Sequence, residues 1–219
     1  MLIVFEGVDA SGKQTQTEIL YNTLKEKGKN VSKITFPDYD SPSSALVKMY
    51  LGGMFGSDPS DVSAYAASAF YAVDRYASFK TDWGKKLESG EIVIADRYVT
   101  SNMIHQAAKI DDKDEKLKFL DWVYDFEYIK LGLPQPDKVF FLDMPPEFSK
   151  KLIAERDNKI TGRKQKDIHE NNSDYLYSAY KNAVFVATQC RWDRIYCVKN
   201  DKIRNIEDIK NEILSKLDF

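Results

Sequence analysis

The 219-residue sequence predicts a three-layer α/β fold, in which a five-stranded parallel sheet carries helices on both faces. Short apolar runs alternate with helical patterns along the chain, and this order is typical of parallel strands joined by helical crossovers. The crossovers are expected to be right-handed, which produces a doubly wound sheet. Neither an internal repeat nor a long linker divides the sequence, so we predict a single domain over residues 1–219.

The first half of the chain supplies three of the predicted strands. The run LIVFE ends at a glycine-rich turn, and Ile19, Leu20 and Leu24 follow at helical spacing in a helix predicted over 15–27, which Gly28 closes. A stretch with no proline, and with no glycine before Gly84, predicts one long helix over 62–87. YDSPSS predicts a turn at 39–44, with a helix start near Ser43 or Ser44. The three strands are LIVFE (2–6), VSKITF (31–36) and EIVIAD (91–96).

The second half continues the alternation. Helical patterns occupy 101–109 and 115–131, and the fourth strand, DKVFFLDM (137–144), is bounded by prolines. Two further helices, the strand RIYCVK (194–199) and a last helix over 206–217 complete the chain. The polar stretch ERDNKITGRKQKDIHENN separates two of these helices, and we predict that residues 155–172 form a mobile lid.

Composition narrows the class of protein. Hydrophobic residues make up 43% and charged residues 30%, which is typical of a globular chain rather than a disordered one. The net charge of −2 gives no overall basic field for nucleic acid, and no apolar run approaches the roughly 18 residues of a membrane span. Cys190 and Cys197 form no CxxC pair, which disfavours structural zinc. The start MLIVFEG does not resemble a signal peptide, so we expect a cytoplasmic protein without nucleic-acid or membrane partners.

A phosphate-binding loop is predicted at GVDASGK, which fits the first seven positions of the eight-residue P-loop pattern between a strand and a helix. Its glycines let backbone N–H groups turn inward, and the helix N-terminus adds partial positive charge. A lysine there reaches the β- and γ-phosphate oxygens of a nucleotide. The alternative is a glycine turn followed by a surface lysine. The predicted ATP contacts are Gly7, Ala10, Ser11, Gly12, Lys13, Gln14 and Thr15.

Two residues of this loop depart from the simplest pattern. Gln14 stands where a Ser or Thr hydroxyl usually binds Mg²⁺, so either its amide oxygen replaces that ligand or Mg²⁺ keeps more water and relies on carboxylates. Thr15 is an alternative hydroxyl for a phosphate. Asp9 places a carboxylate inside an anion site, where it either accepts a hydrogen bond from a sugar hydroxyl of a second substrate or points to solvent.

A second polar cluster follows the third strand in EIVIADRYVTSNMIHQ. Asp96 and Arg97 stand at the carboxyl end of that strand, where open α/β sheets bind ligands. Asp96 is a candidate to hold Mg²⁺ through water, and Arg97 to bind a phosphate with two parallel donors. Ser101 and Asn102 begin the next helix and either face the same cleft or, for Ser101, cap the helix.

A third pair, Tyr71 and Arg75, occurs in AFYAVDRYASF, and its spacing of four places both on one helix face. The tyrosine ring suits stacking on a base, and the guanidinium suits an exocyclic oxygen. The alternative is a core aromatic residue beside a surface arginine.

Together these motifs resemble the thymidylate kinase family. The chain has a P-loop with an internal carboxylate, FP after the second strand, the aromatic-x-x-x-Arg helix, DRYxxSN and a basic lid, in that order, from Leu2 to about Ala187. The resemblance implies transfer of the ATP γ-phosphoryl group to dTMP with Mg²⁺, giving dTDP and ADP, a step of dTTP biosynthesis. It also implies a homodimer.

The resemblance assigns a role to each candidate on the acceptor side. Asp9 would contact the deoxyribose 3′-hydroxyl, Tyr71 would stack on the base, and Arg75 would contact thymine O4. Arg97 would hold the acceptor phosphate. The remaining acceptor contacts that it implies are Pro37 in a cis peptide, Ser101 and Asn102 near the base, and His105 near the sugar.

Three departures from the family pattern alter these expectations. Gln14 replaces the usual hydroxyl residue. Asp38 replaces an arginine after FP, so we expect Asp38 to face away from the phosphate. His105 stands where some members have a tyrosine that helps to exclude a 2′-hydroxyl, so we expect weaker discrimination against ribonucleotides. The P-loop also lacks the arginine of some members, so we predict that Arg156 or Arg163 of the lid acts catalytically beside Lys13 and Arg97.

Rival functions remain at this stage. The nearest is a kinase that phosphorylates dUMP, another nucleotide or a deoxynucleoside, and a rival from another class is a non-catalytic nucleotide-binding regulator in which Gln14 marks lost metal chemistry. A P-loop ATPase with a protein partner gives no account of Tyr71 and Arg75.

Overall fold

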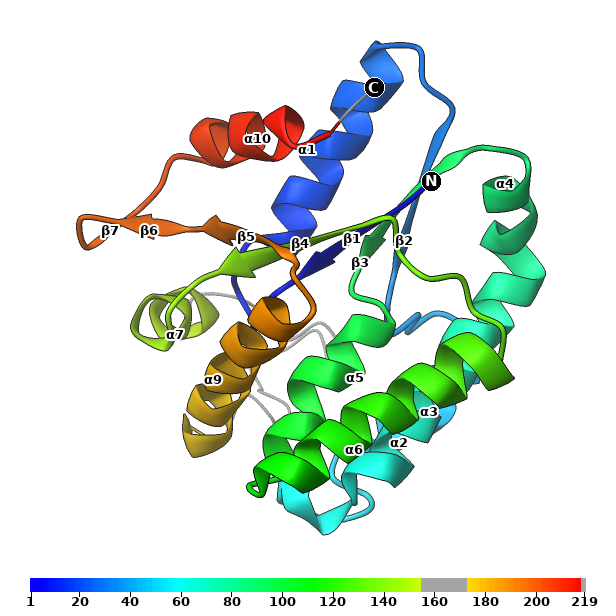
Figure 1. Ribbon diagram of the computed structural model, residues 1–219, viewed down its shortest axis with the longest axis vertical. Helices are drawn as coiled ribbons and strands as arrows, with labels where there is room; N and C mark the ends of the chain where they lie inside the picture. Colours follow the sequence, from blue (N-terminus) through cyan, green and yellow to red (C-terminus); the bar gives the residue numbers. More distant parts are fainter. Residues whose placement is uncertain (155–172, 218–219) are drawn as a thin grey trace.

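The computed structural model describes residues 1–154 and 173–217, and its centre is a five-stranded sheet that is parallel throughout. The strand order is β2-β3-β1-β4-β5, so β1 lies in the middle (Figure 1). This confirms the predicted sheet. The strands are β1 (Leu2–Glu6), β2 (Val31–Thr35), β3 (Ile92–Asp96), β4 (Lys138–Asp143) and β5 (Asp193–Tyr196).

Helices cover both faces of the sheet, as the sequence predicts (Figure 1). One face carries α1 (Lys13–Glu26) and α10 (Ile206–Ser215), and the other carries α5 (Val99–His105) and α9 (Ser173–Gln189). Beyond α5 lie α3 (Ala64–Ser78) and α6 (Lys113–Val123). The remaining α-helices among the described residues are α2 (Ala45–Leu51), α4 (Gly84–Glu88) and α7 (Pro146–Ala154).

Side-chain alternation along β1 builds a core on each face. Ile3 and Phe5 pack with Leu20 of α1 and Ile209 of α10, whereas Leu2 and Val4 belong to the cluster on the opposite face. Successive residues of a strand point to opposite faces, so a continuous apolar run is required when both faces are covered.

Two predicted long helices are interrupted by π-helical turns. The pattern over 62–87 forms α3, a π-helical turn (Phe79–Trp83) and α4, and the pattern over 115–131 forms α6 and a second π-helical turn (Tyr124–Lys130). The predicted helix over 101–109 starts earlier, at Val99, and ends in a 3₁₀ turn (Ala107–Lys109). A 3₁₀ turn (Pro42–Ser44), capped by Ser41, leads into α2.

The predicted strand over 194–199 is wrong in its second half. β5 ends at Tyr196, and the Cys197 N–H donates to the carbonyl of Asp143, the last residue of β4. Since β4 ends there, the following residues have no neighbour in the sheet. They form β6 (Val198–Lys199), which pairs antiparallel with β7 (Lys202–Ile203). Asn200 and Asp201 have φ of 50° and 58°, the conformation that a tight two-residue hairpin requires.

The predicted lid at 155–172 lies outside the described residues. The division of residues 1–219 into one domain with an internal lid therefore stays a prediction. Among the helices of residues 1–154 and 173–217, none has both the length and the apolar character to cross a membrane.

Candidate active site

The P-loop backbone adopts a conformation that its glycines make possible. Gly7 has a φ of 154°, and a Cβ atom there would lie 2.5 Å from Ser11 Oγ and 2.8 Å from the Leu142 carbonyl oxygen. Gly12, with a φ of 91°, caps the N-terminus of α1. The turn therefore places Lys13 as the first helical residue, beside N–H groups that the helix leaves unpaired.

Lys13 is folded over the loop and is almost completely buried. Its Nζ atom donates to the carbonyl oxygens of Gly7 at 3.0 Å and Val8 at 2.8 Å. The pKa of Lys13 is lowered to about 8, mainly by burial and also by the charge of Arg97, while Asp96 and other carboxylates oppose both. Because burial disfavours the charged ammonium, an incoming anion such as a phosphate would stabilise it.

The two candidate metal contacts occupy different environments. Gln14 and Thr15 are exposed on the first turn of α1, whereas Asp96 is buried at the end of β3 and lies near enough to Lys13 to influence its pKa. In the described part of the chain, no group of three or more His, Cys, Asp or Glu side chains could hold a metal ion.

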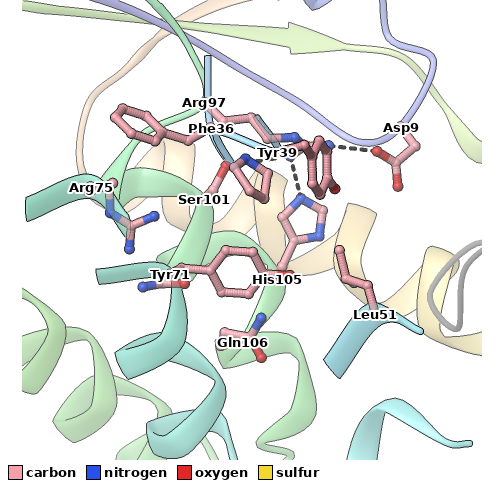
Figure 2. A pocket seen from close by; sticks show the side chains of 12 residues that line it. Asp9, Phe36, Tyr39, Leu51, Tyr71, Arg75, Arg97, Ser101, His105 and Gln106 are labelled. Carbon is pink, nitrogen blue, oxygen red and sulfur yellow. Dashed lines mark hydrogen bonds and ion pairs between the residues drawn. The ribbon is translucent and has the colours of Figure 1, made fainter. Parts of the chain in front are cut away.

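A cleft of about 550 Å³ opens beside this loop, and all eight predicted acceptor contacts line it (Figure 2). It lies beyond the carboxyl ends of β1, β2 and β3, where open α/β sheets bind their ligands. Four further lining residues, which the sequence analysis did not assign to the site, are Phe36, Tyr39, Leu51 and Gln106. The predicted residues that the cleft brings together are Asp9, Pro37, Tyr71, Arg75, Arg97, Ser101, Asn102 and His105.

Arg97 is held between Asp9 and His105 at this cleft (Figure 2). Its Nη2 atom lies 2.6 Å from Asp9 Oδ1, and its Nη1 atom lies 2.8 Å from His105 Nε2. A guanidinium only donates, so His105 Nε2 is assigned as the acceptor. Asp9 thus faces Arg97, and the alternative that it points to solvent is wrong. Arg97 has a φ of 70°, a strained conformation that turns its side chain toward the loop.

Glu6, which the sequence analysis missed, fixes the segment that follows β3 and begins α5. Its carboxylate is fully buried at the end of β1 and accepts hydrogen bonds from the Tyr98 N–H and from the hydroxyls of Thr100 and Ser101. Burial raises the pKa of Glu6, although Arg97 and these hydrogen bonds oppose the shift. The Ser101 hydroxyl therefore anchors α5 to β1 and does not cap the helix. The sequence offered one signal for Glu6, namely a charged residue at the end of an otherwise apolar strand.

Arg75 is not a surface residue, because its side chain is only 1% exposed. Glu127 accepts two hydrogen bonds from its guanidinium, each 2.7 Å long, and a third of 2.7 Å from Asn102 Nδ2. Burial lowers the pKa of Arg75, but the charge of Glu127, its hydrogen bonds and two nearby tyrosines together outweigh burial, and the pKa is raised. Tyr71 lies one helical turn away on the same face, and both side chains line the cleft (Figure 2).

The loop after β2 brings Pro37 and Tyr39 to the cleft. The Phe36–Pro37 peptide is cis, as the family resemblance implies. The Asp38 N–H donates to Asp74 Oδ2 at 2.8 Å, and Asp38 does not appear among the described residues that line the cleft. Gln106 forms part of the cleft wall, and its Oε1 atom is buried without a hydrogen-bond partner among the described residues.

The two predicted lid arginines, Arg156 and Arg163, lie outside the described residues. Their assignment as catalytic groups therefore stays a prediction.

Comparisons with known proteins agree on one family. A family profile described as "Thymidylate kinase" matches residues 5–199. A thymidylate kinase of Mycobacterium tuberculosis is 34% identical over 176 residues, which are 80% of this chain and 77% of the relative. A probable thymidylate kinase of Thermococcus kodakarensis is 28% identical and covers 100% of this chain and 97% of its own. The solved structure of a Candida albicans thymidylate kinase has the same fold, with a TM-score of 0.68 and 21% identity over 98% of this chain and 89% of that one.

Proposed function

The chain belongs to the thymidylate kinase family, and we propose on that premise that it transfers the γ-phosphoryl group of ATP to dTMP, giving dTDP and ADP. The observation that carries this proposal is the cleft itself. A guanidinium suited to a phosphate, a carboxylate suited to a sugar hydroxyl and a second guanidinium suited to a base line one cavity beside the P-loop.

The P-loop is proposed as the donor site. Its backbone N–H groups and Lys13 would hold the β- and γ-phosphates of ATP, with Gly7, Ala10, Ser11 and Gly12 shaping the loop. An anion at this site would compensate the buried charge of Lys13, whose pKa is lowered to about 8. Phosphoryl transfer needs charge compensation and alignment rather than a covalent intermediate, so no side chain has to act as a nucleophile.

In the proposed acceptor site, different residues bind the phosphate, the sugar and the base of dTMP. Arg97 would bind the dTMP phosphate, Asp9 the 3′-hydroxyl, and Arg75 the O4 atom of the base, with Tyr71 stacked on the ring. Pro37, Ser101, Asn102 and His105 would complete the wall. The contact between Arg97 and both Asp9 and His105 supports this division, because it fixes the guanidinium where phosphate and sugar would meet.

Mg²⁺ is the metal expected with ATP, and the residues present are compatible with it. It would neutralise charge on the donor phosphates. The buried carboxylate of Asp96 would contact the ion through water, and the exposed amide of Gln14 is a second candidate ligand. Mg²⁺ keeps several waters in most protein sites, which agrees with the lack of an all-protein cluster in the described part of the chain.

The direct test is an acceptor screen. The purified chain is incubated with ATP and Mg²⁺ and, separately, with dTMP, dUMP, dCMP, AMP and thymidine, and ADP and the phosphorylated products are measured. We expect dTDP from dTMP and loss of turnover without Mg²⁺. Arg97→Ala should lower turnover by about 10²- to 10³-fold, a typical loss for a missing electrostatic contact. Lys118→Ala, on the exposed side of α6, is the control and should behave as wild type. A folded chain that makes no dTDP would refute the proposal.

We also propose a homodimer that forms through the outer side of α3 and works in the cytoplasm. Val73 and Tyr76 are 45% and 38% exposed, and Ala66 and Ala69 continue the same stripe one to two turns earlier. Such a stripe of small and apolar side chains suits close packing of a second helix. Both cysteines are free thiols, which is consistent with a reducing compartment.

A further inference from the structure

Glu127 pairs with only one edge of the Arg75 guanidinium, and one of its three nitrogens takes no part in the ion pair. The carboxylate accepts from Nε and Nη2 at 2.7 Å each, so Nη1 is the nitrogen outside the ion pair. The two side chains are 1% and 0% exposed. A fork held by two parallel hydrogen bonds cannot rotate, and its remaining donor is therefore fixed in direction. Arg75 lines the acceptor cleft, so that donor is available to a bound base (Figure 2).

Glu127 also determines which way the Asn102 amide points. Asn102 Nδ2 donates to Glu127 Oε1 at 2.7 Å and to the Ser68 carbonyl oxygen at 3.2 Å. Both partners accept hydrogen bonds and neither donates one here, so the nitrogen must lie on their side. The carbonyl oxygen of the Asn102 amide is therefore directed away from Glu127. Asn102 is 2% exposed and lines the same cleft as Arg75.

Glu127 lies in the π-helical turn Tyr124–Lys130 that follows α6, and its side chain is buried together with that of Tyr128. It continues the buried face of α6, four residues after Val123. Such π-helical turns often occur at functional sites. Tyr98 and Tyr128 surround the ion pair, and burial raises the pKa of both hydroxyls well above the usual value. The dry surroundings strengthen the hydrogen bonds between Glu127 and its two partners.

We propose that Glu127 is a positioning residue that sets base selectivity, by presenting a donor from Arg75 and an acceptor from Asn102 to the same base edge. This pattern complements the O4 and N3–H groups of thymine or uracil, and it opposes the N4 amino group and N3 lone pair of cytosine. The inference rests on the proposed function, because it assumes that the cleft binds a nucleoside monophosphate.

The test compares kcat/KM for dTMP and dCMP in Glu127→Gln and Glu127→Asp. In Glu127→Gln an amide N–H replaces a carboxylate oxygen opposite an Arg75 N–H, so the fork is no longer held. Glu127→Asp keeps the charge but is too short to reach Arg75 and Asn102 together. We expect the dTMP-to-dCMP ratio of kcat/KM to fall about 10- to 100-fold in Glu127→Gln, and less in Glu127→Asp, with KM for ATP unchanged.

Controls separate this inference from a loss of folding and from the proposed function. Glu212→Gln removes a carboxylate of α10 that pairs with Arg204, and it should keep the wild-type ratio. If Glu127→Gln does not fold, Glu127→Asp replaces it in the test, because it retains the charge opposite Arg75 and is expected to fold. A folded Glu127 variant with the wild-type ratio overturns the inference. If the wild-type chain makes no dTDP, it is the proposed function that fails.

A measurement on the wild-type chain does not depend on any variant. A dTMP analogue methylated at N3 cannot donate to Asn102 and should bind about tenfold or more weakly than dTMP. Equal binding of the two nucleotides would overturn the acceptor role of Asn102.

Discussion

Charged side chains around the cleft are buried or partly buried, and several of them form ion pairs. Glu6 is fully buried beneath α5, Arg75 is paired with Glu127, and Arg97 is paired with Asp9. Removing one partner of a buried pair typically costs about 3–5 kcal/mol, since the other charge stays buried without compensation. Substitutions that preserve shape and change charge are therefore the informative ones at this site, provided that folding is measured beside activity.

Lys13 provides a prediction about pH. Its pKa is about 8 in the folded chain and 10.5 ordinarily, so the unfolded chain binds more protons between these values. Stability should therefore rise with pH through this window, and the Lys13 contribution that opposes folding below pH 8 should disappear as pH approaches 10.5. We expect Lys13→Met to be more stable than wild type at pH 7 by about 1–3 kcal/mol, with a gap that narrows as pH rises.

Urea unfolding of both chains between pH 7 and pH 10 measures that gap. Lys27→Met removes an exposed lysine at the end of α1 and serves as the matched control, whose gap to wild type should stay small throughout. A gap for Lys13→Met that is independent of pH would contradict the lowered pKa of Lys13.

At the scale of an element, a side chain of α3 holds a loop of the acceptor site in place. Asp74 of α3 accepts from the Asp38 N–H at 2.8 Å and from Ser43 Oγ at 2.6 Å, and so ties the loop after β2 to the helix that carries Arg75. Burial raises the pKa of Asp74, while both hydrogen bonds oppose the shift. The loop brings Pro37 and Tyr39 to the cleft, so its attachment affects acceptor binding more than ATP binding.

We expect Asp74→Ala to raise KM for dTMP about tenfold, with KM for ATP changed little, because two hydrogen bonds of roughly 1 kcal/mol each are lost. Asp74→Asn should preserve most of the affinity, since its carbonyl oxygen accepts from the Asp38 N–H and its amide donates to Ser43 Oγ. Steady-state kinetics of the two variants provide the comparison. Equal effects of both substitutions on dTMP and ATP would show a general loss of folding instead.

The sequence was a good guide to elements whose signals are local. LIVFE and the glycines that follow it predicted β1, the P-loop and α1, because strand, turn and helix all lie within a few residues. The partner of Arg75 was invisible by contrast, since Glu127 is 52 residues away, and the hydrogen bond that links Glu127 to Asn102 spans another 25 residues. The π-helical turn that contains Glu127 differs from an α-helix by one residue in hydrogen-bond spacing, and apolar periodicity does not resolve that difference.

At the scale of the whole molecule, α3 links the cleft to the surface. Its inner side carries Tyr71 and Arg75, and its outer side carries Val73 and Tyr76. A partner packed on the outer side would hold the helix from behind and limit its movement relative to α5. The proposed dimer would therefore contribute to acceptor binding as well as to stability, although neither side chain of the outer stripe is among the described residues that line the cleft.

Val73→Glu is expected to separate the dimer, because it places a charge in an apolar contact where a second copy would place the same charge. Sedimentation should give a mass near twice 25.2 kDa for wild type and near 25.2 kDa for the variant. Val73 is 45% exposed, so the substitution should cost the isolated chain little stability. Ile203→Glu, on the exposed β6–β7 hairpin, should remain dimeric. A monomeric wild type would refute the dimer, whereas a monomeric Val73→Glu with unchanged KM for dTMP would show that α3 needs no support from a partner.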